Sequence, residues 1–285
     1  MKFTASIKNG FLLHKILSSF DRACAVTIKI TAESFTLHCQ ETSQWQACIT
    51  IEPSSIFDLP IALISQTGAI HLQVQAIDVL CKAFRSLAVD FCTAFKTTIK
   101  LARVANSCTA LLVTSADPHG NVKLEHTVPV NVLTPLQAAS MILEPEVGDM
   151  PQIQLLLPAC FRALKAACDN LKQFKHVKVV VTSSELTICT PEGPFLGEYA
   201  CKWSKLKTIS SLDQRGNAQE AVAAPVSCSV TLETKELCRA MQAVNVNPSH
   251  GIVSVVNEHC LLLYFFLTPN TQTSMSYFLP NKLIN

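Results

Sequence analysis

The order of secondary-structure elements expected from this sequence occurs twice along its 285 residues. Residues 1–132 have the hydrophobic periodicity of a strand, an amphipathic helix and several strands, and then of a second amphipathic helix with three more strands. Residues 153–280 repeat this order with different side chains. Each half has about the length of an ordinary domain. We therefore expect two similar α+β domains, at residues 1–133 and 153–285, with a connector at residues 134–152.

The composition is that of a folded protein with a well-formed core. Hydrophobic residues make up 49% of the chain and charged residues only 15%, which excludes an intrinsically disordered chain. The formal net charge of +2 is too small to indicate a nucleic-acid partner by itself. A contact with DNA must therefore depend on where the basic residues are placed.

The thirteen cysteines are scattered along the chain, and no two of them form a C-x-x-C pair. A zinc site usually needs paired spacings, and a disulfide framework is typical of short secreted domains. We therefore expect small buried side chains in a reducing compartment, with no metal and no cofactor. The N-terminal segment alternates like a strand and has no apolar signal region, and the longest apolar runs are too short to span a membrane. The sequence predicts a soluble intracellular protein with no membrane partner.

Basic residues recur on the polar face of each expected helix. The four helices are expected at Phe11–Arg22, Ile77–Val89, Pro158–Lys172 and Thr234–Val244. Positions three, four and seven residues apart share a helix face, and these faces hold Lys15, Arg22, Lys82, Arg85, Arg162, Lys165, Lys172, Lys235 and Arg239. Any solvated helix carries such residues, but their recurrence favours helices that face a polyanion, and we expect the basic residues to be confined to the helices. Cations aimed at phosphates bind DNA without reading its sequence.

No motif of a known catalytic site is present. The sequence lacks a Gly-x-Ser-x-Gly elbow, a His-Glu-x-x-His motif and a glycine-rich phosphate loop. His38-Cys39 and His259-Cys260 are adjacent pairs, but neighbours on a strand point to opposite faces of the sheet. We therefore expect a protein without catalytic residues, and a thiol-dependent hydrolase is kept as a distant alternative.

Several segments together resemble the Hus family of checkpoint clamp subunits. They are Met1-Lys2-Phe3, Val128–Val132, Leu157-Pro158, Val246-Asn247-Pro248, Ile252–Asn257 and Met275–Pro280, with the last three the most specific in order and spacing. The resemblance covers nearly the whole chain, but residues 31–70 and 204–225 match poorly. It implies the PCNA-like DNA sliding-clamp fold, in which two similar domains have antiparallel sheets outside and two helices each that face the hole of a ring.

The resemblance also implies a role. A member of this family is a non-catalytic subunit of the nine-one-one complex, a heterotrimer with two other clamp-like subunits that encircles duplex DNA without sequence specificity. A clamp loader places the ring at damaged DNA in the nucleus, although the chain is also compatible with a cytoplasmic pool. The ring supports checkpoint kinase signalling and recruits repair enzymes. The basic helix positions named above are the DNA-facing residues under this resemblance.

In clamp folds, edge strands of neighbouring subunits pair to close the ring. The matching apolar, β-branched segments here are Cys108–Ser115 and His176–Thr182, with Cys108, Leu111, Val113, His176, Val179 and Val181 as the expected interface residues. The acidic, proline-rich connector is expected to be exposed and to border a partner-binding surface. A homotrimeric replication processivity clamp of the PCNA type remains the alternative within this fold.

Overall fold

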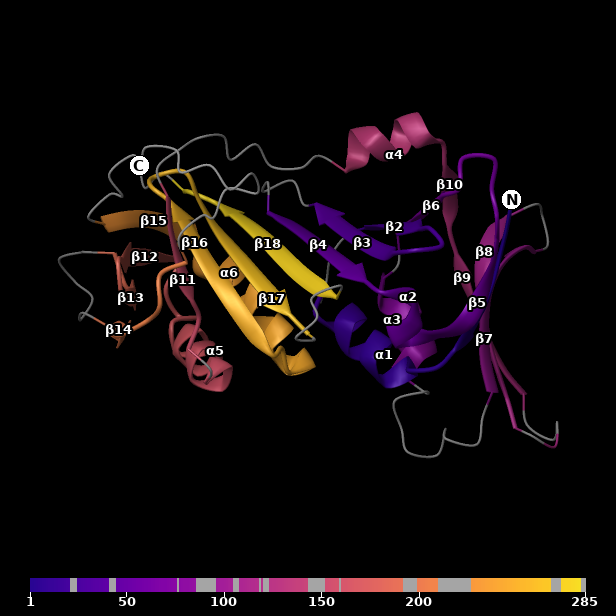
Figure 1. Cartoon of the computed structure of the whole chain (residues 1–285), viewed down its shortest axis with the longest axis horizontal. Helices are drawn as coiled ribbons and strands as arrows, with labels where there is room; N and C mark the ends of the chain where they lie inside the picture. Colours follow the sequence, from indigo (N-terminus) through magenta and orange to yellow (C-terminus); the bar gives the residue numbers. More distant parts are fainter. Residues whose placement is uncertain are drawn as a thin grey trace. The chain divides into compact units, whose positions relative to one another are not determined.

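The computed structural model describes residues 1–20, 25–40, 45–75, 77–85, 96–104, 108–117, 119, 123–142, 152–158, 160–191, 199–209, 227–267 and 273–282. The chain forms two compact units. The first consists of Met1–Thr42, Gln46–Glu144 and Gln272–Ser274, and the second consists of Ser43–Trp45, Pro145–Thr271 and Met275–Asn285. Each unit has its own paired strands and its own pair of helices (Figure 1).

The first unit is built on antiparallel strands. Its elements are β1 (Lys2–Ile7), α1 (Gly10–Ser18), β2 (Val26–Ile30), β3 (Phe35–Gln40), β4 (Gln46–Ile51), α2 (Pro53–Ile56), β5 (Phe57–Ile64), β6 (Ile70–Val74), α3 (Ile77–Arg85), β7 (Lys96–Arg103), β8 (Thr109–Ala116), β9 (Lys123–Pro129), β10 (Asn131–Leu133) and α4 (Pro135–Met141). One sheet has the order β5-β1-β7-β8-β9, and β10-β6-β2-β3-β4 also pair in that order. Ile28, Leu37 and Ile49 lie side by side across β2, β3 and β4 and are fully buried, as alternation along a half-buried strand requires.

The helices α1 and α3 pack against each other in this unit (Figure 1). Helix α1 begins where the Asn9 side chain accepts a hydrogen bond of 2.9 Å from the backbone N–H of Leu12, which satisfies one of the free donors of the first turn. Leu13 and Ile16 face the core from α1, and Phe84 does so from α3. The polar faces of both helices therefore point away from the core.

The second unit repeats this plan. Its elements are β11 (Gln152–Leu156), α5 (Phe161–Asn170), β12 (His176–Thr182), β13 (Leu186–Cys189), β14 (Ala200–Trp203), β15 (Ser227–Glu233), α6 (Thr234–Ala240), the 3-10 helix η3 (Met241–Val246), β16 (His250–Val256), β17 (Cys260–Phe266) and β18 (Ser274–Pro280). One sheet has the order β14-β13-β12-β15, and β18-β17-β16-β11 also pair in that order. Val230, Val179 and Ile188 are buried neighbours across β15, β12 and β13.

Helix α5 packs closely against strand β16. Phe161, Leu164 and Cys168 form its buried face. Gly251 on β16 lies so close to α5 that an added Cβ would meet the Phe161 ring at 3.2 Å and Leu157 Cδ1 at 3.0 Å. Helix α5 also packs against α6 and η3, and the Cys238 thiol donates a hydrogen bond of 3.2 Å to the Cys168 carbonyl between them.

Most expected elements are present, with shorter helices than the sequence suggests. The expected strand at residues 122–133 is divided, because β9 and β10 pair with different neighbours. The connector contains a helix that we did not expect, α4, which begins with a capping box between Thr134 and Gln137. The division between the two units, at Glu144 and Pro145, falls within the expected connector. No helix among the described residues is long and apolar enough to cross a membrane.

The prediction that Cys108–Ser115 and His176–Thr182 are edge strands is wrong. Strand β8 lies between β7 and β9, and β12 lies between β13 and β15. The side chains proposed for an interface are therefore internal: Leu111, Val113, Val179 and Val181 are buried, His176 is half-buried, and Cys108 is an exposed residue just before β8. The physical reason is that the apolar pattern of a strand reports which of its faces are buried and not whether it has one neighbouring strand or two.

Candidate nucleic-acid interface

In the first unit, the expected basic residues lie on the polar faces of α1 and α3. The Lys15 ammonium is 4.3 Å from the centre of the Phe11 ring, a cation–π contact that holds both side chains along α1. Lys82 forms an exposed ion pair of 3.3 Å with Asp78, one turn earlier on α3. Arg85 is exposed at the end of α3. Arg22 lies outside the described residues.

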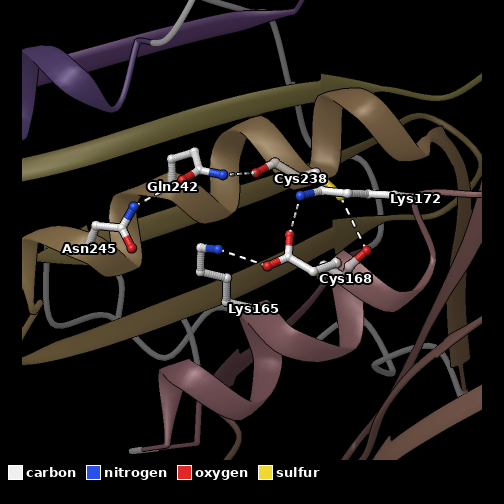
Figure 2. Close-up of polar contacts among 7 residues, drawn as sticks. Lys165, Cys168, Lys172, Cys238, Gln242 and Asn245 are labelled. Carbon is white, nitrogen blue, oxygen red and sulfur yellow. Dashed lines mark hydrogen bonds and ion pairs between the residues drawn. The ribbon is translucent and has the colours of Figure 1, made fainter.

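In the second unit, α5 and the turn after it carry three basic residues and one acid, Arg162, Lys165, Lys172 and Asp169. Arg162 is exposed at the start of the helix. Lys165 Nζ lies 2.8 Å from Asp169 Oδ2, and Lys172 Nζ lies 2.7 Å from Asp169 Oδ1 (Figure 2). Desolvation raises the pKa of Asp169, but the hydrogen bonds from both lysines outweigh it and hold this pKa below its usual value. The carboxylate is therefore ionised at neutral pH.

Helix α6 adds the remaining two basic positions. Lys235 is exposed in its first turn and Arg239 is half-buried in its last turn, where a cation is favoured by the helix dipole. Between them, the buried Glu236 forms an ion pair of 3.5 Å with Lys282, which follows β18. The packing of α5 on α6 brings Arg162, Lys165, Lys172, Lys235 and Arg239 onto one helix pair, as that of α1 on α3 does for Lys15, Lys82 and Arg85.

The expectation that basic residues are confined to the helices is wrong. Exposed lysines also lie on strands, at Lys2, Lys96, Lys100, Lys123, Lys178 and Lys202. Lys123 and Lys202 form ion pairs with Glu125 and Glu185, at 3.1 and 2.8 Å. A lysine on the outer face of a strand fits the same alternation as any other polar residue, so these lysines do not stand out as a basic surface in the sequence. Charge placement alone therefore does not single out the helices.

Thiol chemistry receives no support from the described cysteines. Burial raises the pKa of the Cys168 and Cys238 thiols, and that of Cys260 to about 11, so these thiols are protonated and poor nucleophiles at neutral pH. The sequence argument missed one cross-strand neighbour pair, His38 Nε2 and Cys48 Sγ, which lie 3.8 Å apart on β3 and β4. Burial, helped by the positive charge of Lys29, lowers the pKa of His38 to about 4. His38 is therefore neutral at neutral pH and supplies no imidazolium that would stabilise a thiolate.

The described residues include no group of three or more His, Cys, Asp and Glu side chains that could hold a metal ion. Their arrangement instead offers two helix pairs, one in each unit, with exposed cations on polar faces.

The fold is that of a sliding clamp. The proliferating cellular nuclear antigen of Entamoeba histolytica superposes with a TM-score of 0.71 at 14% sequence identity, and the match covers 99% of each chain. PCNA of Thermococcus kodakaraensis has a TM-score of 0.67 at 13% identity, over 98% of this chain and all of that one. At these identities the likeness establishes the fold and nothing finer. The expected α+β sliding-clamp fold is thus confirmed.

Sequence comparison identifies the protein family to which the chain belongs. A search of curated protein sequences finds no match. The family model described as Hus1-like protein matches residues 1–282, which is nearly the entire chain. The resemblance seen in the terminal segments is therefore confirmed, and the chain belongs to the Hus1-like family.

Proposed function

We propose that this chain is a non-catalytic subunit of a heterotrimeric checkpoint clamp, the nine-one-one complex, that encircles duplex DNA. In this role it supports DNA damage checkpoint signalling and the recruitment of repair enzymes in the nucleus, after a clamp loader has placed the ring. The observation that carries the proposal is the match of the Hus1-like family model over residues 1–282, together with the clamp fold of the same residues.

The DNA contact is assigned to the two helix pairs. Their polar faces point away from the cores and carry Lys15, Lys82, Arg85, Arg162, Lys165, Lys172, Lys235 and Arg239. Arg22 belongs to the same proposal from the sequence alone. Arg162 and Lys235 are exposed and have no ion-pair partner among the described residues, so we expect them to make the strongest phosphate contacts.

We assign the ring contact to two of the edge strands, β9 and β14, in place of the strands first expected. Strand β15 is also at the end of its sheet. Its outer edge is already occupied, however, because the side chains of Asn257 and Asn281 accept hydrogen bonds of 2.9 Å from the backbone N–H groups of Ser229 and Thr231. Strand β11 is covered by residues 207–209, because Leu156 N–H donates to the Lys207 carbonyl and Ile209 N–H to that of Gln154. Among the described residues, β14 has no such cover. Open edges are where strands of another chain add.

We assign the binding site for partner proteins to the connector, residues 134–152. Helix α4 is exposed on nearly all of its surface, and its Leu136 side chain is 83% exposed, so both are accessible to another protein. We therefore keep the proposal that residues 134–152 separate two domains and border a surface for repair or signalling proteins. Cleavage by a protease between Leu133 and Ile153, with both halves still folded, is the expected result.

The oligomeric state tests the proposal against the homotrimeric replication clamp. A heterotrimer subunit has edges that fit other chains, so the chain alone is expected to sediment as a monomer, and to co-purify from cells with two different clamp-fold chains in equal amounts. A discrete homotrimer in sedimentation velocity, with no other clamp chain recovered from cells, would establish the replication-type alternative instead.

A further inference from the structure

One acidic side chain lies within the basic stripe of α5. Asp169 follows Lys165 by four residues, so these two share one face of α5, and Lys172 lies in the turn that follows the helix, within reach of the same carboxylate. Each carboxylate oxygen receives one ammonium group, at 2.8 Å from Lys165 and 2.7 Å from Lys172 (Figure 2). Asp169 therefore bridges the two lysines that would otherwise be free to contact an anion.

The bridge occupies the place that a phosphate would take. A phosphodiester presents two non-bridging oxygens, and a carboxylate also presents two oxygens. An ammonium group binds an oxygen of either anion at about the same distance. The side chain of Lys165 is only 23% exposed and that of Asp169 is 31% exposed, so solvent screens this bridge less than a pair at the open surface. The Lys172 side chain is 56% exposed, so a DNA phosphate that approaches α5 competes with the carboxylate for the ammonium groups of both lysines.

The ion pairs formed by Asp78 and Glu185 differ from the Asp169 bridge in exposure or in the number of lysines. Asp78 pairs with Lys82 on α3 at 3.3 Å, but both side chains are at least 66% exposed and only one lysine is involved. Glu185 holds Lys202 at 2.8 Å on a strand, again with one lysine. The Asp169 carboxylate, by contrast, lies within ion-pair distance of two lysines.

We propose that Asp169 competes with the DNA backbone for Lys165 and Lys172 and so limits the affinity of α5 for phosphate. A ring that slides must exchange phosphate contacts continually, and an internal anion lowers the cost of releasing each one because the lysines return to a partner. This inference rests on the proposed function, in which α5 faces DNA.

The test compares the clamp complex co-purified with the full chain and the complex co-purified with its Asp169→Asn variant, for binding to a fluorescent DNA duplex over a series of KCl concentrations. Releasing two lysines should tighten binding at low salt and steepen the slope of log affinity against log salt by up to about 1.8, at about 0.9 per phosphate contact. Glu185→Gln is the matched control, because it removes the same charge and frees Lys202 on a strand. It should change the slope far less. Adding Lys165→Ala and Lys172→Ala to Asp169→Asn should abolish the gain.

The outcomes separate this inference from the proposed function. Arg162→Glu weakens DNA binding if α5 faces DNA. If it does so while Asp169→Asn leaves affinity unchanged, or tightens it no more than Glu185→Gln, the competition by Asp169 is refuted and the proposed function stands. If Arg162→Glu has no effect, α5 does not face DNA, and both fail. Thermal unfolding monitors each variant, and Asp169→Ser replaces Asp169→Asn if the latter does not fold.

Discussion

At the scale of single residues, the buried pair of Glu236 and Lys282 is the contact whose loss should matter most for stability. Glu236 is 2% exposed and lies 3.5 Å from the Lys282 ammonium. The sequence could not predict this pair, because the two residues are far apart along the chain and meet only through the packing of α6. By contrast, the pairing of Lys165 with Asp169 follows from helical spacing and could have been predicted.

Replacing Lys282 by Met is expected to destabilise the protein by up to about 3 kcal/mol, since a buried carboxylate loses its cation. The control is Lys123→Met, which breaks an exposed pair with Glu125 and should cost less than about 1 kcal/mol. Urea unfolding measures both free energies. Equal losses of unfolding free energy for the two variants would show that the buried pair of Glu236 and Lys282 stabilises the fold no more than an exposed pair does.

His38 should make the fold sensitive to acid. Burial and Lys29 lower its pKa to about 4 in the folded state, against about 6.5 in an unfolded chain. The unfolded state therefore binds the proton more tightly, so the contribution of His38 to stability is fully present above pH 6.5 and is lost as the pH falls from about 6.5 to about 4. Below about pH 4, His38 is protonated in both the folded and the unfolded state, so it adds no further change in stability with pH.

The His38→Gln variant should lose less stability than the wild type between these pH values, because it has no proton to bind. Urea unfolding at a series of pH values measures the difference. Identical acid dependence of the two proteins would mean that another group controls this transition, and His71, whose pKa is also lowered by burial and by Lys29, is then the next candidate.

At the scale of elements, helices were easier to predict than the positions of strands within sheets. The apolar stripes of α1, α3 and α5 repeat with the helical period, so their existence and buried faces followed from the sequence. Alternation identifies a strand but not its neighbours, which is why the internal strands β8 and β12 were mistaken for edges. Helix α4 was missed because its seven residues are too few to show a helical repeat of apolar positions, although Thr134 and Gln137 have the spacing of a capping box.

The edge strand β9 gives a prediction about assembly. Leu124 is a 45% exposed apolar residue on β9, and Leu59 is a 59% exposed apolar residue on β5, the opposite edge of the same sheet. If β9 closes the ring, Leu124→Glu should reduce co-purification of the other clamp subunits, whereas Leu59→Glu should not. Both variants should fold, because both side chains are exposed. Loss of partners with Leu59→Glu alone would place the contact at β5.

At the scale of the whole molecule, we propose that the helices and not the strands meet DNA. Lysines on strands make this claim open to test, since both surfaces carry positive charge. Lys100 and Lys178 are exposed on β7 and β12, which are internal strands and take no part in the proposed ring contact. They are therefore suitable controls for Arg162 and Lys235 on the helices.

The most direct measurement compares two double variants of the full chain, Arg162→Glu with Lys235→Glu and Lys100→Glu with Lys178→Glu. Each changes the net charge by the same amount, so any difference in binding to duplex DNA reports where the charges lie. The helix variant should weaken binding without sequence preference and flatten the slope of log affinity against log salt by up to about 1.8. The strand variant should leave that slope nearly unchanged. If the strand variant weakens binding as much as the helix variant or more, the helices do not face DNA and the account is contradicted.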